Sequence, residues 1–157
     1  MKLILLDLLH FTLFNFSQIL DDLISPSICS KIESMVKRPQ LKFLKDQVVY
    51  VLDGSKTLEP RPRSHQWIER LSDAEELDLT YGPRFAPPKV FARAKIEKIE
   101  VRPFETTTKE DLEQISRGWE DKTPEEFAQV HNEWYAKELA KGYPVVWVFF
   151  KVLETFE

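Results

Sequence analysis

Apolar side chains recur at every second position in residues 90–101, which is the period of a β-strand with one face in a hydrophobic core. The even positions from Val90 to Ile96 are apolar, and the phase changes before Ile99. A change of parity within one strand is typical of a β-bulge, because one extra residue turns the following side chains to the other face. We therefore expect a long strand here, with a bulge near residues 97–98.

Further stretches are predicted to be extended. Residues 144–154 are apolar on both faces, which favours an inner strand that is covered on both sides. Residues 56–61 are extended as well, but Pro60 and Pro62 restrict them to the edge of a sheet, since proline cannot donate a hydrogen bond to a neighbouring strand. The remaining extended stretches are residues 38–44 and 76–82.

Helices are expected between these strands. Residues 45–54 are predicted to form a helix that ends at Gly54. The apolar spacing turns three of its side chains toward the core, namely Val48, Val49 and Leu52.

Two more helices are expected nearer the C-terminal end. Thr107 with Glu110 predicts a capping box for a helix over residues 108–117, and Thr123 followed by Pro-Glu-Glu predicts another for residues 124–141. The core-facing stripe of the second helix consists of Phe127, Val130 and Trp134.

Together these elements predict an α+β fold, in which a small β-barrel of mostly antiparallel strands is flanked by helices. The small residues Ala92 and Ala94 suit the narrow interior of such a barrel. The domain is expected over residues 35–157. Residues 1–34 are predicted to be a helical extension, because polar residues interrupt their apolar run, which is also too short to span a bilayer.

Composition limits the kind of ligand. The chain of 157 residues has one cysteine and three histidines, so we expect a reducing, cytoplasmic compartment and neither a structural zinc site nor another metal. The net charge of −4 is uneven, since residues 56–102 hold ten Lys or Arg against eight Asp or Glu, whereas residues 103–157 hold six against twelve. A protein that coats nucleic acid carries a broad basic face. We expect a small ligand, or a short single-stranded segment held at one spot.

The stretch DGSKTLEPRPRSH, residues 53–65, gathers cations directly after a glycine turn. If Lys56 points into a cleft, burial lowers its pKa and makes the neutral amine available as a nucleophile or base; the alternative is a solvated lysine. Glu59 is expected on the opposite face of the strand from Lys56 and on the same face as Arg61, where an ion pair forms. In the other interpretation, Arg61 and Arg63 form a planar fork for a phosphate or a base edge.

A second candidate stretch is SRGWEDKTPEEF, residues 116–127. Trp119 can stack on a base, and Glu120 in the same loop can act as a general acid or base. The alternative is that Trp119 packs at the edge of the core and Glu120 is solvated. His131 and Trp134 of the following helix are predicted to pack in the core or beside it rather than to bind a ligand.

The order of these motifs resembles the ASCH domain family. The resemblance covers residues 38–154 and is carried by LDGSKTLEPR, ARAKIEKIEV, TPEEFAQVHNEWY and PVVWVFFKVLE. Its more specific parts are the Gly54-x-Lys56-Thr57 start and the helix with Trp134. The resemblance implies a PUA-like β-barrel with a cleft beside the segment that follows the glycine turn, and recognition of RNA or of a modified nucleoside in that cleft.

The resemblance also implies a possible chemistry. Some small members of the family are amidohydrolases that remove the acyl group of N4-acetylcytidine. By position, Lys56 matches their proposed nucleophile and Glu120 matches their acidic residue. Glu59 stands where those members have a threonine, and a carboxylate there raises the pKa of the lysine and weakens it as a nucleophile.

Two hypotheses follow. The first, which we favour, is a module that binds short single-stranded RNA, a nucleoside or a nucleotide, with no metal, membrane or cofactor. Its ligand contacts come from Lys56, Thr57, Arg61, Arg63 and Trp119. The second is a metal-independent amidohydrolase, whose catalytic residues are Lys56, Glu120 and Glu59.

Overall fold

The computed structural model describes residues 37–156, so the predicted extension over residues 1–34 lies outside it. The strands are β1 (Gln40–Phe43), β2 (Leu58–Pro62), β3 (Glu76–Tyr81), β4 (Lys89–Val101) and β5 (Val145–Thr155). The α-helices are α3 (Val48–Leu52), α4 (His65–Ser72), α5 (Lys109–Ile115), α6 (Pro124–Trp134) and α7 (Ala136–Ala140). Short 3-10 turns form η1 (Lys45–Gln47), η2 (Phe104–Thr106) and η3 (Trp119–Asp121).

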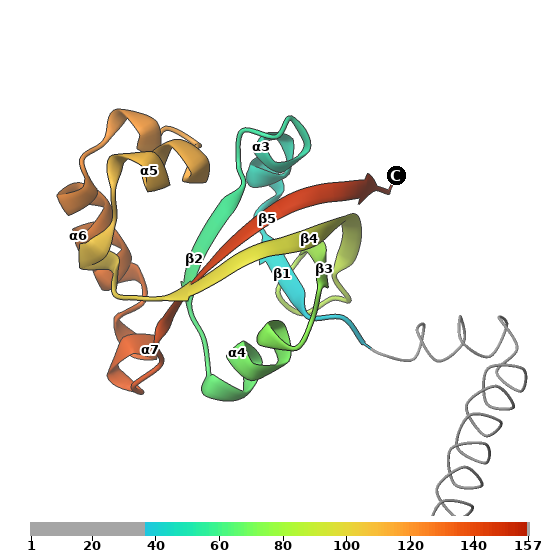
Figure 1. The fold of residues 1–157 in the computed structure, drawn as a ribbon, viewed down its shortest axis with the longest axis horizontal. Helices are drawn as coiled ribbons and strands as arrows, with labels where there is room; N and C mark the ends of the chain where they lie inside the picture. Colours follow the sequence, from blue (N-terminus) through green and yellow to red (C-terminus); the bar gives the residue numbers. More distant parts are fainter. Residues whose placement is uncertain (1–36, 157) are drawn as a thin grey trace, which may run out of the picture. The chain divides into compact units, whose positions relative to one another are not determined.

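The strands form one curled sheet, a half-barrel, in the order β1-β3-β4-β5-β2 (Figure 1). β1 pairs with β3 in parallel, and the other three pairings are antiparallel. The predicted α+β fold with a mostly antiparallel, PUA-like barrel is confirmed. β2 lies at an edge of the sheet, as Pro60 and Pro62 predict.

The long strand β4 contains the predicted bulge. Its register with β5 shifts between Ile96 and Lys98, so Glu97 has no partner on β5. A second shift lies between Arg93 and Ala94. Ala92 and Ala94 are fully buried inside the curl of the sheet, as their small size predicts.

Strand β5 is buried on both faces from Val145 to Phe150, where its alternating side chains belong to two separate cores, whereas most of its last five residues are exposed. Val146, Val148 and Phe150 pack inside the half-barrel, together with side chains of β1, β3, β4, α3 and α4. Val145 and Trp147 face the other way and pack against α5 and α6. In Figure 1, α5, α6 and α7 accordingly gather on one side of the sheet, while α3 and α4 lie beside its other half.

The helix predicted over residues 45–54 forms, but it turns a different face inward. Val51 is fully buried, whereas Val49 and Leu52 are 58% and 48% exposed, so the expected core positions are wrong for these two residues. The first three residues form the 3-10 turn η1, which has about 3.0 residues per turn instead of 3.6 and so rotates the following side chains.

The capping boxes are largely as expected. Thr123 and Glu126 cap α6, with Pro124 at its first position, as predicted. For α5 the box is shifted by one residue and consists of Thr108 and Asp111. The hydroxyl of Thr107 donates to the carbonyl of Phe104 at 2.5 Å instead.

The helix predicted over residues 124–141 is interrupted at Tyr135, where φ is −105° and ψ is 17°, and continues as α7. Trp134, which was expected in the core, is 62% exposed, while His131 is buried. Trp134 is the last residue of α6, directly before the interruption. None of the helices within residues 37–156 has the length and apolar character needed to cross a bilayer.

Candidate ligand-binding site

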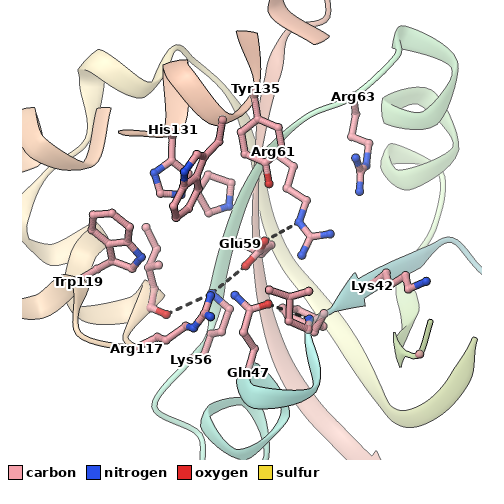
Figure 2. A pocket seen from close by; sticks show the side chains of 16 residues that line it. Lys42, Gln47, Lys56, Glu59, Arg61, Arg63, Arg117, Trp119, His131 and Tyr135 are labelled. Atoms are coloured by element: carbon pink, nitrogen blue, oxygen red, sulfur yellow. Dashed lines mark hydrogen bonds and ion pairs between the residues drawn. The ribbon is translucent and has the colours of Figure 1, made fainter. Parts of the chain in front are cut away.

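A buried network of charges lies at the start of β2. The carboxylate of Glu59 accepts from Lys56 Nζ at 2.8 Å and from Arg61 Nε at 2.5 Å. Figure 2 shows Glu59 between the two cations. The ion pair with Arg61 confirms the prediction, but the expected separation of Glu59 from Lys56 is wrong. Lys56 precedes the first residue of β2, so strand alternation does not govern its side chain.

The ammonium group of Lys56 has three acceptors. Besides Glu59, it donates to the carbonyl oxygens of Leu58 at 3.3 Å and Ile115 at 3.1 Å. Only 1% of the residue is exposed. Because an ammonium group has three N–H donors, each of them has an acceptor here.

Burial and charge act in opposite directions on this network. Burial lowers the pKa of Lys56 from its ordinary value, and the Glu59 carboxylate offsets part of that shift. Burial alone raises the pKa of Glu59, but the charges and hydrogen bonds of Arg61 and Lys56 outweigh it and lower the pKa to about 2. Glu59 is therefore ionised at neutral pH.

A cavity of about 420 Å³ opens over this network, which is within the usual size of small-ligand pockets, about 300–1,000 Å³. It lies at the seam of the half-barrel, because both edge strands of the sheet contribute side chains to it. The cations of Lys56 and Arg61, from the β2 side, lie 5.9 Å and 5.5 Å from the ring centre of Phe43 on β1. The cavity is lined by Lys42, Phe43, Leu44, Gln47, Lys56, Glu59, Pro60, Arg61, Arg63, Gly82, Ile115, Arg117, Trp119, His131, Trp134 and Tyr135.

One wall of the cavity is aromatic. The rings of Trp119 and Trp134 lie 5.1 Å and 5.0 Å from the imidazole of His131, centre to centre. Burial lowers the pKa of His131 to about 4, so its ring is neutral at pH 7. His131 Nδ1 lies 2.9 Å from the carbonyl oxygen of Phe127, which can only accept, so Nδ1 carries the proton and Nε2 is an acceptor.

The rest of the lining is strongly cationic, with five Lys or Arg side chains against one carboxylate. Arg61 pairs with Glu59, and Arg117 pairs with Asp46. Within residues 37–156, no carboxylate lies within ion-pair distance of Arg63 or Lys42. Burial lowers the pKa of Arg63, and the neighbouring Arg61 lowers it further.

The two candidate stretches of the sequence meet in this cavity. The predicted site residues that line it are Lys56, Glu59, Arg61, Arg63 and Trp119. Thr57 lines a separate cavity of about 560 Å³ instead. Glu120 is exposed on η3 and is not part of the lining, and its backbone carbonyl accepts from Lys109 Nζ.

Some lining residues were not predicted. Lys42 and Gln47 carry no sequence signal that separates them from solvated side chains. His131 and Trp134, which the sequence predicts in the core or beside it, line the cavity together with Tyr135. In the part of the chain that is described, no group of His, Cys, Asp and Glu side chains is arranged to hold a metal ion.

Comparison with known proteins supports the fold. No family model and no curated protein matches the sequence. Among solved structures, the hypothetical protein PH0355 is similar, with a TM-score of 0.52 and 20% identity over 73% of this chain and 97% of that one. The protein PF0455 from Pyrococcus furiosus has a TM-score of 0.48 and 21% identity, over 73% of this chain and 96% of its own. An ASCH domain from Lactobacillus crispatus has a TM-score of 0.49 and 14% identity, over 87% of this chain and 90% of its own.

Sequence identities as low as these, 14–21%, show at most a shared fold and nothing about function. The likeness to PH0355 supports the fold. The resemblance of the sequence motifs to the ASCH family stays a prediction. What this chain binds has to come from the chemistry of its own cavity.

Proposed function

We propose that this protein binds nucleotides or short single-stranded RNA in the cavity over Glu59. One observation carries the proposal: a chain with a net charge of −4 places five cationic side chains and one carboxylate around a single cavity. Lys56 and Arg61 share Glu59, and Arg117 pairs with Asp46, but Lys42 and Arg63 have no carboxylate partner among residues 37–156. Positive charge that is left uncompensated costs free energy unless an anion binds beside it. The ligand is therefore anionic.

The aromatic wall supports a nucleotide over a simple anion. Single-stranded nucleic acids are held by cations that contact phosphate and by aromatic side chains that stack on the bases. Arg63 and Lys42 supply cations without a carboxylate partner among the described residues, and Trp119 and Trp134 supply aromatic surface. Both kinds of group line the same cavity.

The experiment is fluorescence anisotropy with a fluorescein-labelled octamer of uridylate at about 50 mM salt. We expect the octamer to bind. The logarithm of the binding constant should fall linearly with the logarithm of the salt concentration, with a slope of about −0.7 for each phosphate contact on a single strand. Lys42→Gln should weaken binding and reduce the slope by about one such contact. Lys95→Gln, which removes an exposed charge from β4, is the control. Absence of binding by the wild-type protein contradicts the proposal.

A second candidate function is hydrolysis of an acylated nucleoside by Lys56. The observation that favours it is that the amine lies at the cavity, buried, with its pKa lowered. Against it, all three N–H groups of the ammonium have acceptors, and Glu120 does not line the cavity. We therefore expect that the protein does not deacetylate N4-acetylcytidine, which the absorbance of the nucleoside measures. Deacetylation that disappears in Lys56→Met would establish the hydrolase instead.

A further inference from the structure

A second cavity, of about 310 Å³, adjoins the first. It is lined by Arg117, Gly118, Trp119, Lys122 and Trp134. Arg117 and the two tryptophans also line the first cavity, so the two cavities meet at these three side chains. Its lining contains two cations and no carboxylate.

We infer that the second cavity holds the next nucleotide of a single strand, so that the ligand is a dinucleotide or longer rather than a free nucleoside. The inference rests on the proposed function of the first cavity and adds the length of the ligand. In this arrangement the base of the second nucleotide stacks on Trp134, and its phosphate contacts Arg117 and Lys122.

Trp134 supplies the stacking surface. It is 62% exposed, which is unusual for so large an apolar side chain. Its ring packs edge-on against Trp119, at 6.2 Å between ring centres and an interplanar angle of 76°. The indole is thus supported from one side while much of its surface is open to solvent. Base stacking on such a ring tolerates any sequence, because every base has a π face.

The turn that carries Arg117 is strained in a way that fits this role. Ser116 and Arg117 have positive φ angles of 59° and 63°, although neither is glycine. Backbone strain of this kind persists where the surrounding structure imposes it, and it clusters at ligand sites. The partner of Arg117 is Asp46, whose side chain is 58% exposed, so solvent screens the pair and a phosphate can compete for the guanidinium.

Lys122 provides the second cation, and no carboxylate lies within ion-pair distance of it among residues 37–156. It lines the second cavity and not the first. Removing its charge therefore tests the second cavity alone, whereas a change at Trp134 affects both.

The experiment compares uridine 5′-monophosphate with the 5′-phosphorylated dinucleotide pUpU by isothermal titration calorimetry. We expect pUpU to bind about tenfold more tightly or better, since a stacked base and an added phosphate contact each contribute. Lys122→Gln should reduce the preference for pUpU while leaving the monophosphate affinity unchanged. Trp134→Ala should reduce the preference further. Both residues are exposed, so the variants are expected to fold.

The matched control is Lys137→Gln, which removes an exposed charge from α7 and touches neither cavity. Equal affinities for the two ligands, or a preference that Lys122→Gln and Lys137→Gln leave equally unchanged, overturn the inference while the proposed function stands. If neither ligand nor the uridylate octamer binds, the proposed function fails and the inference fails with it.

Discussion

Replacing Glu59 by glutamine is expected to lower the free energy of unfolding by about 3–5 kcal/mol, as removal of one partner from a buried ion pair does. Glu59 accepts from Lys56 at 2.8 Å and from Arg61 at 2.5 Å. Without the carboxylate, two buried cations lie side by side with no negative charge between them. Urea denaturation of the purified variant measures the loss.

Two variants serve as controls for this result. Glu120→Gln removes an exposed carboxylate and should change stability by no more than about 0.5 kcal/mol. Lys56→Met combined with Glu59→Gln should be more stable than Glu59→Gln alone, because one of the two unpaired charges is gone. A loss below about 1 kcal/mol in Glu59→Gln contradicts the role of this carboxylate.

Acid titration gives an independent readout of the same carboxylate. The pKa of Glu59 is lowered from its ordinary value of 4.5 to about 2, so the folded state holds the proton less tightly than the unfolded chain. The resulting stabilisation, about 3 kcal/mol, is complete above pH 4.5 and is lost as the pH falls toward 2. Glu59→Gln should lack this part of the acid dependence.

Sequence periodicity predicted the elements whose burial depends only on the order of apolar and polar residues within one continuous segment. The two-sided burial of residues 145–150 follows from a continuous apolar run, and the bulge of β4 near Glu97 follows from a change of parity. The break at Tyr135 could not be predicted in this way, since neither glycine nor proline marks it. Tyr135 stacks on Phe104 at 6.0 Å, and this contact lies between residues far apart in the chain.

The candidate site was predicted where cations and a turn occur together, as in the segment from Lys56 to Arg63. It was missed where the backbone departs from regular geometry. Three successive residues, Ser116 to Gly118, have positive φ, so the alternation of side chains in that loop cannot be read from the sequence. Of the two residues predicted from this loop, Trp119 lines the cavity and Glu120 lies on the surface, while Arg117, which was not predicted, lines the cavity as well.

Replacing Arg63 by glutamine is expected to weaken nucleotide binding without weakening the fold. Hydrogen bonds to charged groups contribute about 1.5–3 kcal/mol, so the dissociation constant for the uridylate octamer should rise about 10- to 150-fold. Anisotropy with the labelled octamer measures this change. Arg70→Gln, which removes an exposed arginine from α4, should leave the affinity unchanged.

The stability of the same variant distinguishes a binding residue from a structural one. Burial and the adjacent Arg61 both lower the pKa of Arg63, which means that its charge is less favourable in the folded protein than in water. The charges of Tyr135, Glu59 and Glu138 oppose this shift only in part. The direct contacts of the guanidinium are weak, namely one hydrogen bond to the carbonyl of Pro62 at 3.3 Å and a cation–π contact with Trp67 at 5.2 Å. The thermal midpoint of Arg63→Gln should therefore equal or exceed that of the wild type, whereas that of Glu59→Gln should fall. A lowered midpoint with unchanged affinity in Arg63→Gln would mean that the cation stabilises the fold, and the anionic ligand would lose its main support.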